Sequence, residues 1–143
     1  MNRNDTLHKV LEHMARIFRY MSVSCAVPYG EHSLNKPQTD IMFFVANSKN
    51  GQTVTELASL LHVTSGAITQ FTNDLVQKKL IVREEHKQDR RYITLRLYPS
   101  AKDKFEKFKK AYFTTVNPLF VNLKDDELQL LLKLMGKIDS TKV

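Results

Sequence analysis

The sequence of 143 residues contains one cysteine, Cys25, no tryptophan, and only four glycines and four prolines. A single cysteine cannot form an internal disulfide, which excludes a disulfide-stapled fold and favours a reducing compartment. No apolar run approaches the roughly 18 residues of a membrane span, and the first residues, MNRNDTLHKV, lack the apolar segment of a secretory signal. We therefore expect a cytoplasmic protein that has no membrane partner.

Motifs for nucleotide binding, metal binding and catalysis are also missing. The four glycines, Gly30, Gly51, Gly66 and Gly136, lie too far apart to form a phosphate-binding loop. The five histidines include no pair at i and i+4, and no Ser-His-Asp or Cys-His grouping stands out. We expect neither an enzyme nor a metal site, and no cofactor.

Positive charge is what the sequence has in excess, and it is concentrated in one stretch. The formal net charge is +7, and residues 76–110 hold 12 Lys/Arg against 5 Asp/Glu, while the rest of the chain holds 10 of each sign. Nucleic acid is the leading partner for such a stretch. An anionic membrane surface is the second, but the sequence lacks a Trp/Phe/Leu-rich helix with a basic opposite face of the kind that binds membranes, so we expect no membrane partner. A basic face that serves only solubility is the third interpretation.

Apolar spacing predicts a mainly helical chain. A first helix over residues 5–26 is predicted by a heptad seam formed by Leu7, Leu11, Met14, Phe18, Met21 and Cys25. A last helix that begins near Asp125 is apolar nearly all round, at positions that include Leu128, Leu131, Met135 and Ile138. Such a helix cannot be buried on every side in so small a monomer, so we expect both helices to form a homodimer interface.

Short elements are predicted between these two helices. They are helices over residues 37–46, 56–62 and 65–79, strands over residues 81–85 and 91–97, and a long helix over residues 100–122. Thr55 and Thr64 are expected to cap the second and third of these helices, whose short separation matches a helix-turn-helix. Pro118 is expected to bend the long helix, with Leu119 facing inward.

The helix predicted over residues 65–79 has an uncharged polar face. Ile68, Phe71 and Leu75 form its inward stripe, whereas a face built for solubility would more often carry Glu and Lys on the other side. Side chains of Ser, Thr, Asn and Gln can read donors and acceptors in the DNA major groove, and a glycine in the first turn lets a phosphate approach the backbone. The candidate DNA-contacting residues here are Thr64, Ser65, Gly66, Thr69, Gln70 and Asn73.

The segment EEHKQDRRYITLRL, residues 84–97, predicts a hairpin with a charged tip. Its alternation places Ile93, Leu95 and Leu97 on one face and Thr94 on the other. A solvated turn does not need so much charge, which a negatively charged partner could use. The candidate contact residues at the tip are Lys87, Asp89, Arg90 and Arg91.

Residues 54–97, VTELASLLHVTSGAITQFTNDLVQKKLIVREEHKQDRRYITLRL, resemble the winged helix-turn-helix of the multiple-antibiotic-resistance-regulator (MarR) family of bacterial transcription factors. The matching features are TELA, the turn residue Val63, the helix end DLVQKKLI, and Asp89 and Arg91 in the wing. The flanking helices are arranged similarly, so the resemblance covers almost the whole chain. The segment LYPSAKDK departs from the family because it has Pro99 and no glycine after the second wing strand.

The resemblance implies a mainly α fold with a small β-hairpin wing (α+β) in a single domain of residues 1–143. It places a DNA-binding module at residues 37–98 and dimerisation helices at residues 5–27 and 100–140. The hairpin tip would reach the minor groove, with Asp89 holding Arg91 extended and with Lys87 and Arg90 on phosphates. The expected dimerisation residues are Leu7, Leu11, Met14, Phe18, Leu128, Leu131, Met135 and Ile138.

The predicted function is sequence-specific binding of double-stranded DNA by a ligand-responsive repressor, a homodimer on a pseudo-palindromic operator. The resemblance implies a small aromatic or anionic effector near Tyr20, Tyr29, Phe43 and Phe113, although core packing also explains these aromatics. One alternative is a winged-helix adaptor that binds protein without DNA readout. Another is an oxidant-sensing regulator that uses Cys25, which as a small apolar residue also fits the seam of the first helix.

Overall fold

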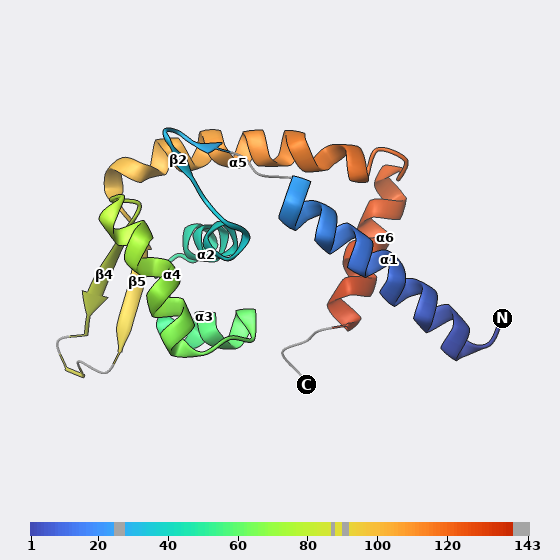
Figure 1. The fold of residues 1–143 in the computed structure, drawn as a ribbon, viewed down its shortest axis with the longest axis horizontal. Helices are drawn as coiled ribbons and strands as arrows, with labels where there is room; N and C mark the ends of the chain where they lie inside the picture. Colours follow the sequence, from blue (N-terminus) through green and yellow to red (C-terminus); the bar gives the residue numbers. More distant parts are fainter. Residues whose placement is uncertain (25–27, 87, 90–91, 139–143) are drawn as a thin grey trace.

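The computed structural model describes residues 1–24, 28–86, 88–89 and 92–138 (Figure 1). The α-helices are α1 (Arg3–Ser24), α2 (Lys36–Asn47), α3 (Val54–Leu61), α4 (Ser65–Gln77), α5 (Lys102–Val116) and α6 (Asp125–Lys137). The 3₁₀ helices are η1 (Pro99–Ala101) and η2 (Asn117–Leu119). The strands are β1 (Pro28–Tyr29), β2 (His32–Ser33), β3 (Gln52–Thr53), β4 (Ile81–Glu85) and β5 (Ile93–Leu97). The predicted fold class, mainly α with a small hairpin, is confirmed.

The larger sheet has the strand order β3-β5-β4 and is antiparallel throughout. Strands β4 and β5 pair from Ile81 opposite Leu97 to Glu85 opposite Ile93, and together with their connection they form the hairpin that we call the wing. Gly51 leads into β3 with a φ of +79°, and a Cβ atom there would lie only 2.6 Å from the carbonyl oxygen of Leu95. Glycine is therefore required where the loop meets the sheet.

The hydrophobic core lies between α2, α3, α4, the larger sheet and the first part of α5. Its fully buried residues include Ile41, Met42, Leu57, Ile68, Leu75, Leu80, Ile81 and Leu95. Tyr29, from the small β1–β2 hairpin, closes this core against α5, because its hydroxyl donates to the carbonyl oxygen of Ala101 at 2.8 Å and its ring centroid lies 5.1 Å from that of Phe108. Burial raises the pKa of Tyr29 to about 12.

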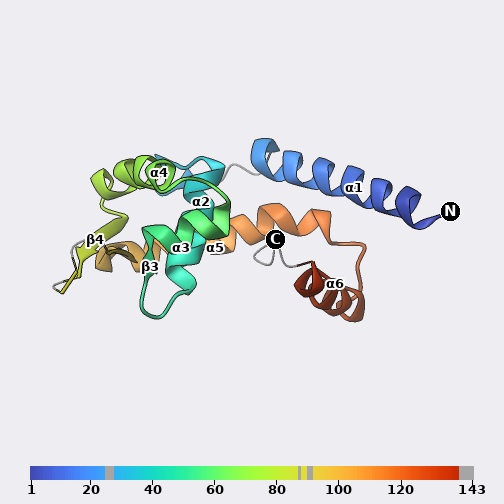
Figure 2. The same ribbon diagram turned by 90° about the horizontal axis from the view of Figure 1, so that it is seen from below.

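The two terminal helices lie at the end of the molecule away from the wing (Figures 1 and 2). Within the described residues, neither α1 nor α6 has a fully buried side chain. Leu7 is 51% exposed, and Leu11 and Phe18 are each 54% exposed, on the seam that the sequence predicts for a dimer. The single chain therefore leaves the apolar surface of both helices uncovered.

Several local predictions are wrong. Thr53 caps α3 in place of Thr55, because its hydroxyl accepts from the amide of Glu56 while the Glu56 side chain accepts from the amide of Thr53. The long helix ends at Val116 instead of bending at Pro118, which lies in the 3₁₀ turn η2. Leu119 is 36% exposed and does not face the core.

The small sheet and the wing also differ from expectation. The β1–β2 hairpin has only two residues in each strand, too few for an alternation to predict it. Among the described residues, the second wing strand begins at Ile93 and leaves out Tyr92, which the prediction includes, and Thr94, on the polar side of the alternation, is buried. Thr94 is buried because β5 is the central strand, with β3 and β4 on its two sides.

Candidate nucleic-acid interface

A tight turn joins α3 to α4. His62 ends α3 in the left-handed conformation with a φ of 53°, and the amide of Val63 donates to the carbonyl of Ala58 at 3.0 Å. Thr64 then caps α4, since its hydroxyl accepts from the amide of Ala67 at 3.1 Å. The predicted cap at Thr64 is confirmed, and the turn sets the start of the second helix.

The outward face of α4 is polar and uncharged, as the sequence predicts. Its exposed residues are Ser65, Gly66, Thr69, Gln70, Asn73 and Gln77. The hydroxyl of Thr69 donates to the carbonyl of Ser65 at 3.0 Å, which leaves the oxygen lone pairs of Thr69 facing outward. Ile68 and Leu75 are fully buried on the opposite side, so the core fixes which face of α4 meets the solvent.

Arg83, on strand β4 of the wing, contacts α4 directly. Its Nη2 atom lies 2.7 Å from Asn73 Oδ1, 2.8 Å from Thr72 Oγ1 and 3.1 Å from the carbonyl oxygen of Thr69. From the sequence alone, Arg83 counts only toward the basic stretch. Its position two residues after the buried Ile81, and hence on the same face of the strand, is the signal that could have indicated this contact.

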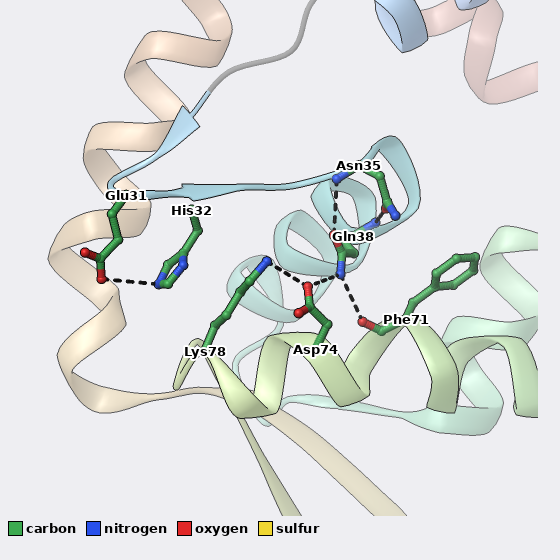
Figure 3. A network of polar contacts seen from close by, with 7 residues as sticks. All are labelled: Glu31, His32, Asn35, Gln38, Phe71, Asp74 and Lys78. Atoms are coloured by element: carbon green, nitrogen blue, oxygen red, sulfur yellow. Dashed lines mark hydrogen bonds and ion pairs between the residues drawn. The ribbon is translucent and has the colours of Figure 1, made fainter.

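A second set of polar contacts holds α4 from the side of α2 (Figure 3). Gln38 Nε2 donates to Asp74 Oδ2 at 2.8 Å and to the carbonyl of Phe71 at 3.3 Å. Lys78 Nζ also donates to Asp74 Oδ2 at 2.8 Å. The hydrogen bonds from Lys78 and Gln38 lower the pKa of Asp74 below its ordinary value of 3.8.

Gln38 has two structural roles at once. Its Oε1 accepts from the amide of Asn35 at 3.2 Å, and the side chain of Asn35 accepts from the amide of Gln38 at 2.9 Å, which completes a capping box at the start of α2. The spacing of Asn35 and Gln38 could have indicated the cap, but the contact with Asp74 crosses 36 positions of sequence and has no local signal. Gln38 therefore couples the start of α2 to the middle of α4.

The wing tip is only partly within the described residues. Lys87, Arg90 and Arg91 lie outside them, so the predicted pairing of Asp89 with Arg91 stays a prediction. Near the tip, the amide of Tyr92 donates to the carbonyl of Asp89 at 3.2 Å, and the amide of His86 donates to the carbonyl of Tyr92 at 3.2 Å. These bonds place Asp89 at the turn of the hairpin, where the sequence predicts it.

The basic stretch is divided between two parts of the fold. Five of its lysines, Lys102, Lys104, Lys107, Lys109 and Lys110, lie on α5, and Figure 1 shows α2 between α5 and α3. Only the bases that precede α5 belong to α4 and the wing. Treating the excess charge as one patch is therefore too simple.

The helix pair α3–α4 and the antiparallel wing together define a winged helix-turn-helix. Residues 32–91 match the sequence model described as the MarR family. The chain is 24% identical over 111 residues to the HTH-type transcriptional repressor YetL of Bacillus subtilis (strain 168), an alignment that covers 77% of this chain and 66% of that protein. It is 29% identical over 98 residues to the HTH-type transcriptional regulator YpoP of the same organism, which covers 68% of this chain and 70% of YpoP.

Solved structures share the fold over nearly the whole chain. The transcriptional regulator BldR from Sulfolobus solfataricus has a TM-score of 0.81 at 22% identity, covering 96% of this chain and 97% of that one. A mutant of MarR from E. coli, complexed with operator DNA, has a TM-score of 0.74 at 18% identity, covering 96% and 99%. The resemblance to the MarR family that the sequence indicates is therefore confirmed, by the matched residues 32–91 and by these relatives.

These relatives are named as transcriptional regulators and not as enzymes, which fits the expectation of a non-enzymatic protein. In the part of the chain that the structure describes, no three His, Cys, Asp or Glu side chains are grouped so that they could hold a metal ion. No helix among the described residues is long and apolar enough to span a membrane. Cys25, the candidate oxidant sensor, lies outside the described residues.

Proposed function

We propose that the protein is a sequence-specific transcriptional regulator that binds double-stranded DNA with α4 in the major groove and the wing beside it. The observation that carries this proposal is the outward face of α4, where uncharged hydrogen-bonding side chains are exposed on a helix held from both sides. Such side chains match the donor and acceptor pattern of base edges. The candidate contacts remain Thr64, Ser65, Gly66, Thr69, Gln70 and Asn73, with Lys87, Asp89, Arg90 and Arg91 in the wing.

The protein is proposed to act as a homodimer through α1 and α6. The support is apolar surface that one chain leaves uncovered, including a groove of about 360 Å³ on α6 lined by Phe120, Leu128, Leu131, Leu132 and Met135. Exposed apolar surface of this kind is typical of interaction sites. A two-fold dimer would place two recognition helices on a pseudo-palindromic operator.

Repression and response to an effector are the finer parts of the proposal. Repression is supported by the relative YetL, which is named as a transcriptional repressor. The effector is supported by the family resemblance. Of the four aromatics considered for its site, Tyr29 is buried in the core and Phe43 packs against it through Phe105 and Phe108, whereas Tyr20 and Phe113 are exposed. Tyr20 and Phe113 are therefore the most accessible of the four, and the half-buried Phe43 lies beside Phe113, with ring centroids 6.1 Å apart.

A titration with random duplex DNA at several salt concentrations tests DNA binding itself. We expect binding at low salt, with an affinity that falls linearly on a log–log plot as salt rises, because cations of the protein displace counterions from phosphates. An adaptor that has lost DNA readout would show no binding at low salt. That outcome would reject the proposed function.

A further inference from the structure

We propose that Arg83 is a positioning residue that fixes Asn73 as a hydrogen-bond donor, so that this position of α4 favours guanine or thymine over adenine. The inference deepens the proposed function and rests on it, because it concerns which bases the recognition helix reads. It depends on one contact, the 2.7 Å hydrogen bond from Arg83 Nη2 to Asn73 Oδ1.

The orientation of the Asn73 amide follows from this contact. A guanidinium carries only donors, so the amide atom that faces Arg83 must be the oxygen. Arg83 is itself anchored, since the same Nη2 atom lies 2.8 Å from the hydroxyl of Thr72, which is fully buried, and 3.1 Å from the carbonyl of Thr69. The hydroxyl of Thr72 in turn donates to the carbonyl of Ile68 at 2.9 Å, so this anchor is held within α4.

The atom left for DNA is Nδ2. The two polar atoms of an amide diverge from its carbon, so Nδ2 points away from Arg83 and offers two donors and no acceptor. Asparagine recognises adenine through an acceptor and a donor that face N6 and N7 of one base together. Asn73 cannot present both while its oxygen is turned to Arg83, and the positive charge beside that oxygen disfavours an incoming amino group.

Guanine and thymine suit the remaining donors. Guanine presents N7 and O6 in the major groove, and thymine presents O4, and all three atoms are acceptors. Cytosine presents only an amino donor there. Adenine presents the acceptor N7 next to its amino donor N6, so it can take one bond from Nδ2 but loses the second bond of the paired contact. The contact with Arg83 therefore predicts a base preference that Asn73 alone, free to rotate its amide, would not have.

Selection of bound duplexes from a random pool tests the inference, with wild type, Asn73→Ala, Arg83→Met and Arg96→Met run in parallel. The position whose preference Asn73→Ala abolishes is the one that Asn73 reads. We expect wild type to select guanine or thymine there over adenine by roughly tenfold. Arg83→Met keeps a long unbranched side chain but removes the N–H donors. It should admit adenine at that position only.

Arg96→Met is the matched control. Arg96 lies on the same hairpin and donates to Glu84 Oε2 at 2.8 Å, so its replacement removes the same charge without touching Asn73. We expect the wild-type profile from it. Asn73→Asp provides a second test should Arg83→Met fail to fold: it keeps an oxygen for Arg83 but replaces the donors with an acceptor, and it should shift the preference to adenine or cytosine.

Three outcomes would overturn the inference while leaving DNA binding intact. The first is that wild type selects adenine at the Asn73 position. The second is that Arg83→Met keeps the wild-type base preferences and loses affinity evenly on all sequences, as the loss of a phosphate contact would give. The third is that no position of the site depends on Asn73. Enrichment of no sequence by wild type would instead reject sequence-specific binding, and the inference with it.

Discussion

Asn73 and Asp74 are adjacent residues of α4 that are held from opposite sides. Arg83 binds Asn73 from the wing, and Gln38 binds Asp74 from α2, while Lys78, at the end of α4 itself, also donates to Asp74. Each bond alone contributes about 1 kcal/mol, or somewhat more where a charged group takes part. Together they oppose rotation of α4 about its axis, which would otherwise change the set of side chains that faces outward.

Asp74 should make stability depend on pH in the acid range. Because its pKa is lower in the folded chain than its ordinary 3.8, the carboxylate adds stability that is present above about pH 4 and is lost as pH falls through the folded pKa. We expect Asp74→Asn to be less stable than wild type at pH 7, with a difference that shrinks toward pH 3. Urea unfolding across this range measures it.

Lys78→Met is the companion variant, because Lys78 is the largest cause of the lowered pKa of Asp74. It should move the acid loss of stability to higher pH. A difference between wild type and Asp74→Asn that stays constant from pH 7 to pH 3 would show that the carboxylate gains nothing from its neighbours.

Asp89 permits a test of the wing in which two explanations predict opposite signs. If Asp89 only adds negative charge near DNA, Asp89→Asn should strengthen binding. If Asp89 holds Arg91 extended, as the family resemblance implies, the substitution should weaken specific binding, because ordering a freed arginine costs up to about 2 kcal/mol of side-chain entropy. Titrations of a selected duplex at several salt concentrations would distinguish the two, and tighter binding would contradict the positioning role.

At the scale of elements, the entry into β3 depends on Gly51. Gly51→Ala would force a side chain into a positive φ and place Cβ 2.6 Å from the carbonyl oxygen of Leu95. We expect a loss of more than about 2 kcal/mol, since the strain of the left-handed backbone alone costs about 1–2 kcal/mol. Thermal or urea unfolding measures this loss.

Gly30 provides the control for that substitution. It also has a positive φ, of +59°, but nothing lies within 4 Å of the position of a Cβ atom. Gly30→Ala should therefore show the backbone cost alone, about 1–2 kcal/mol. Equal losses for the two variants would mean that the approach of Gly51 to β5 does not matter.

The sequence predicts those elements that have an apolar periodicity sustained over many residues, or a capping residue close in sequence. The helix α1, the cap of α4 at Thr64 and the strand β4 are found where the pattern places them within the described residues. The cap at Thr53 could also be predicted from the sequence, because Glu56 follows it by three residues, which is the spacing of a capping box. Burial of Thr94 could not be predicted, because it depends on β3, whose Thr53 pairs with Thr94 from 41 residues earlier.

In the candidate site, too, the features set by local sequence can be predicted, and the features set by contacts between distant elements cannot. The polar face of α4 can be predicted from helical periodicity, because it depends only on positions within one helix. The contacts of Arg83 with Asn73 and of Gln38 with Asp74 join different elements. Strand alternation places Arg83 on the same face as Ile81, but it does not identify Asn73 as the partner, and Gln38 has no local signal for Asp74. The sequence therefore predicts which side chains face outward, and the tertiary structure determines how they are oriented.

At the scale of the whole molecule, the uncovered helices predict an obligate dimer. Permanent interfaces of this kind bury upwards of roughly 2,000 Å². Replacing Leu131 and Met135 with Asp should give monomers or insoluble protein, whereas Lys133→Asp on the same helix should leave the dimer intact. Sedimentation measures the mass, and a stable wild-type monomer at micromolar concentration would contradict the prediction.

The central claim is that the outward face of α4 reads base edges, and the ratio of affinities for a selected and a scrambled duplex tests it most directly. Wild type should prefer the selected duplex, whose half-sites should lie about 34 Å apart. The double variant Thr69→Ala, Asn73→Ala should lose at least about tenfold of that ratio, since each base contact is worth about 1–3 kcal/mol, while its affinity for the scrambled duplex stays the same. A double variant that keeps the wild-type ratio would contradict the account.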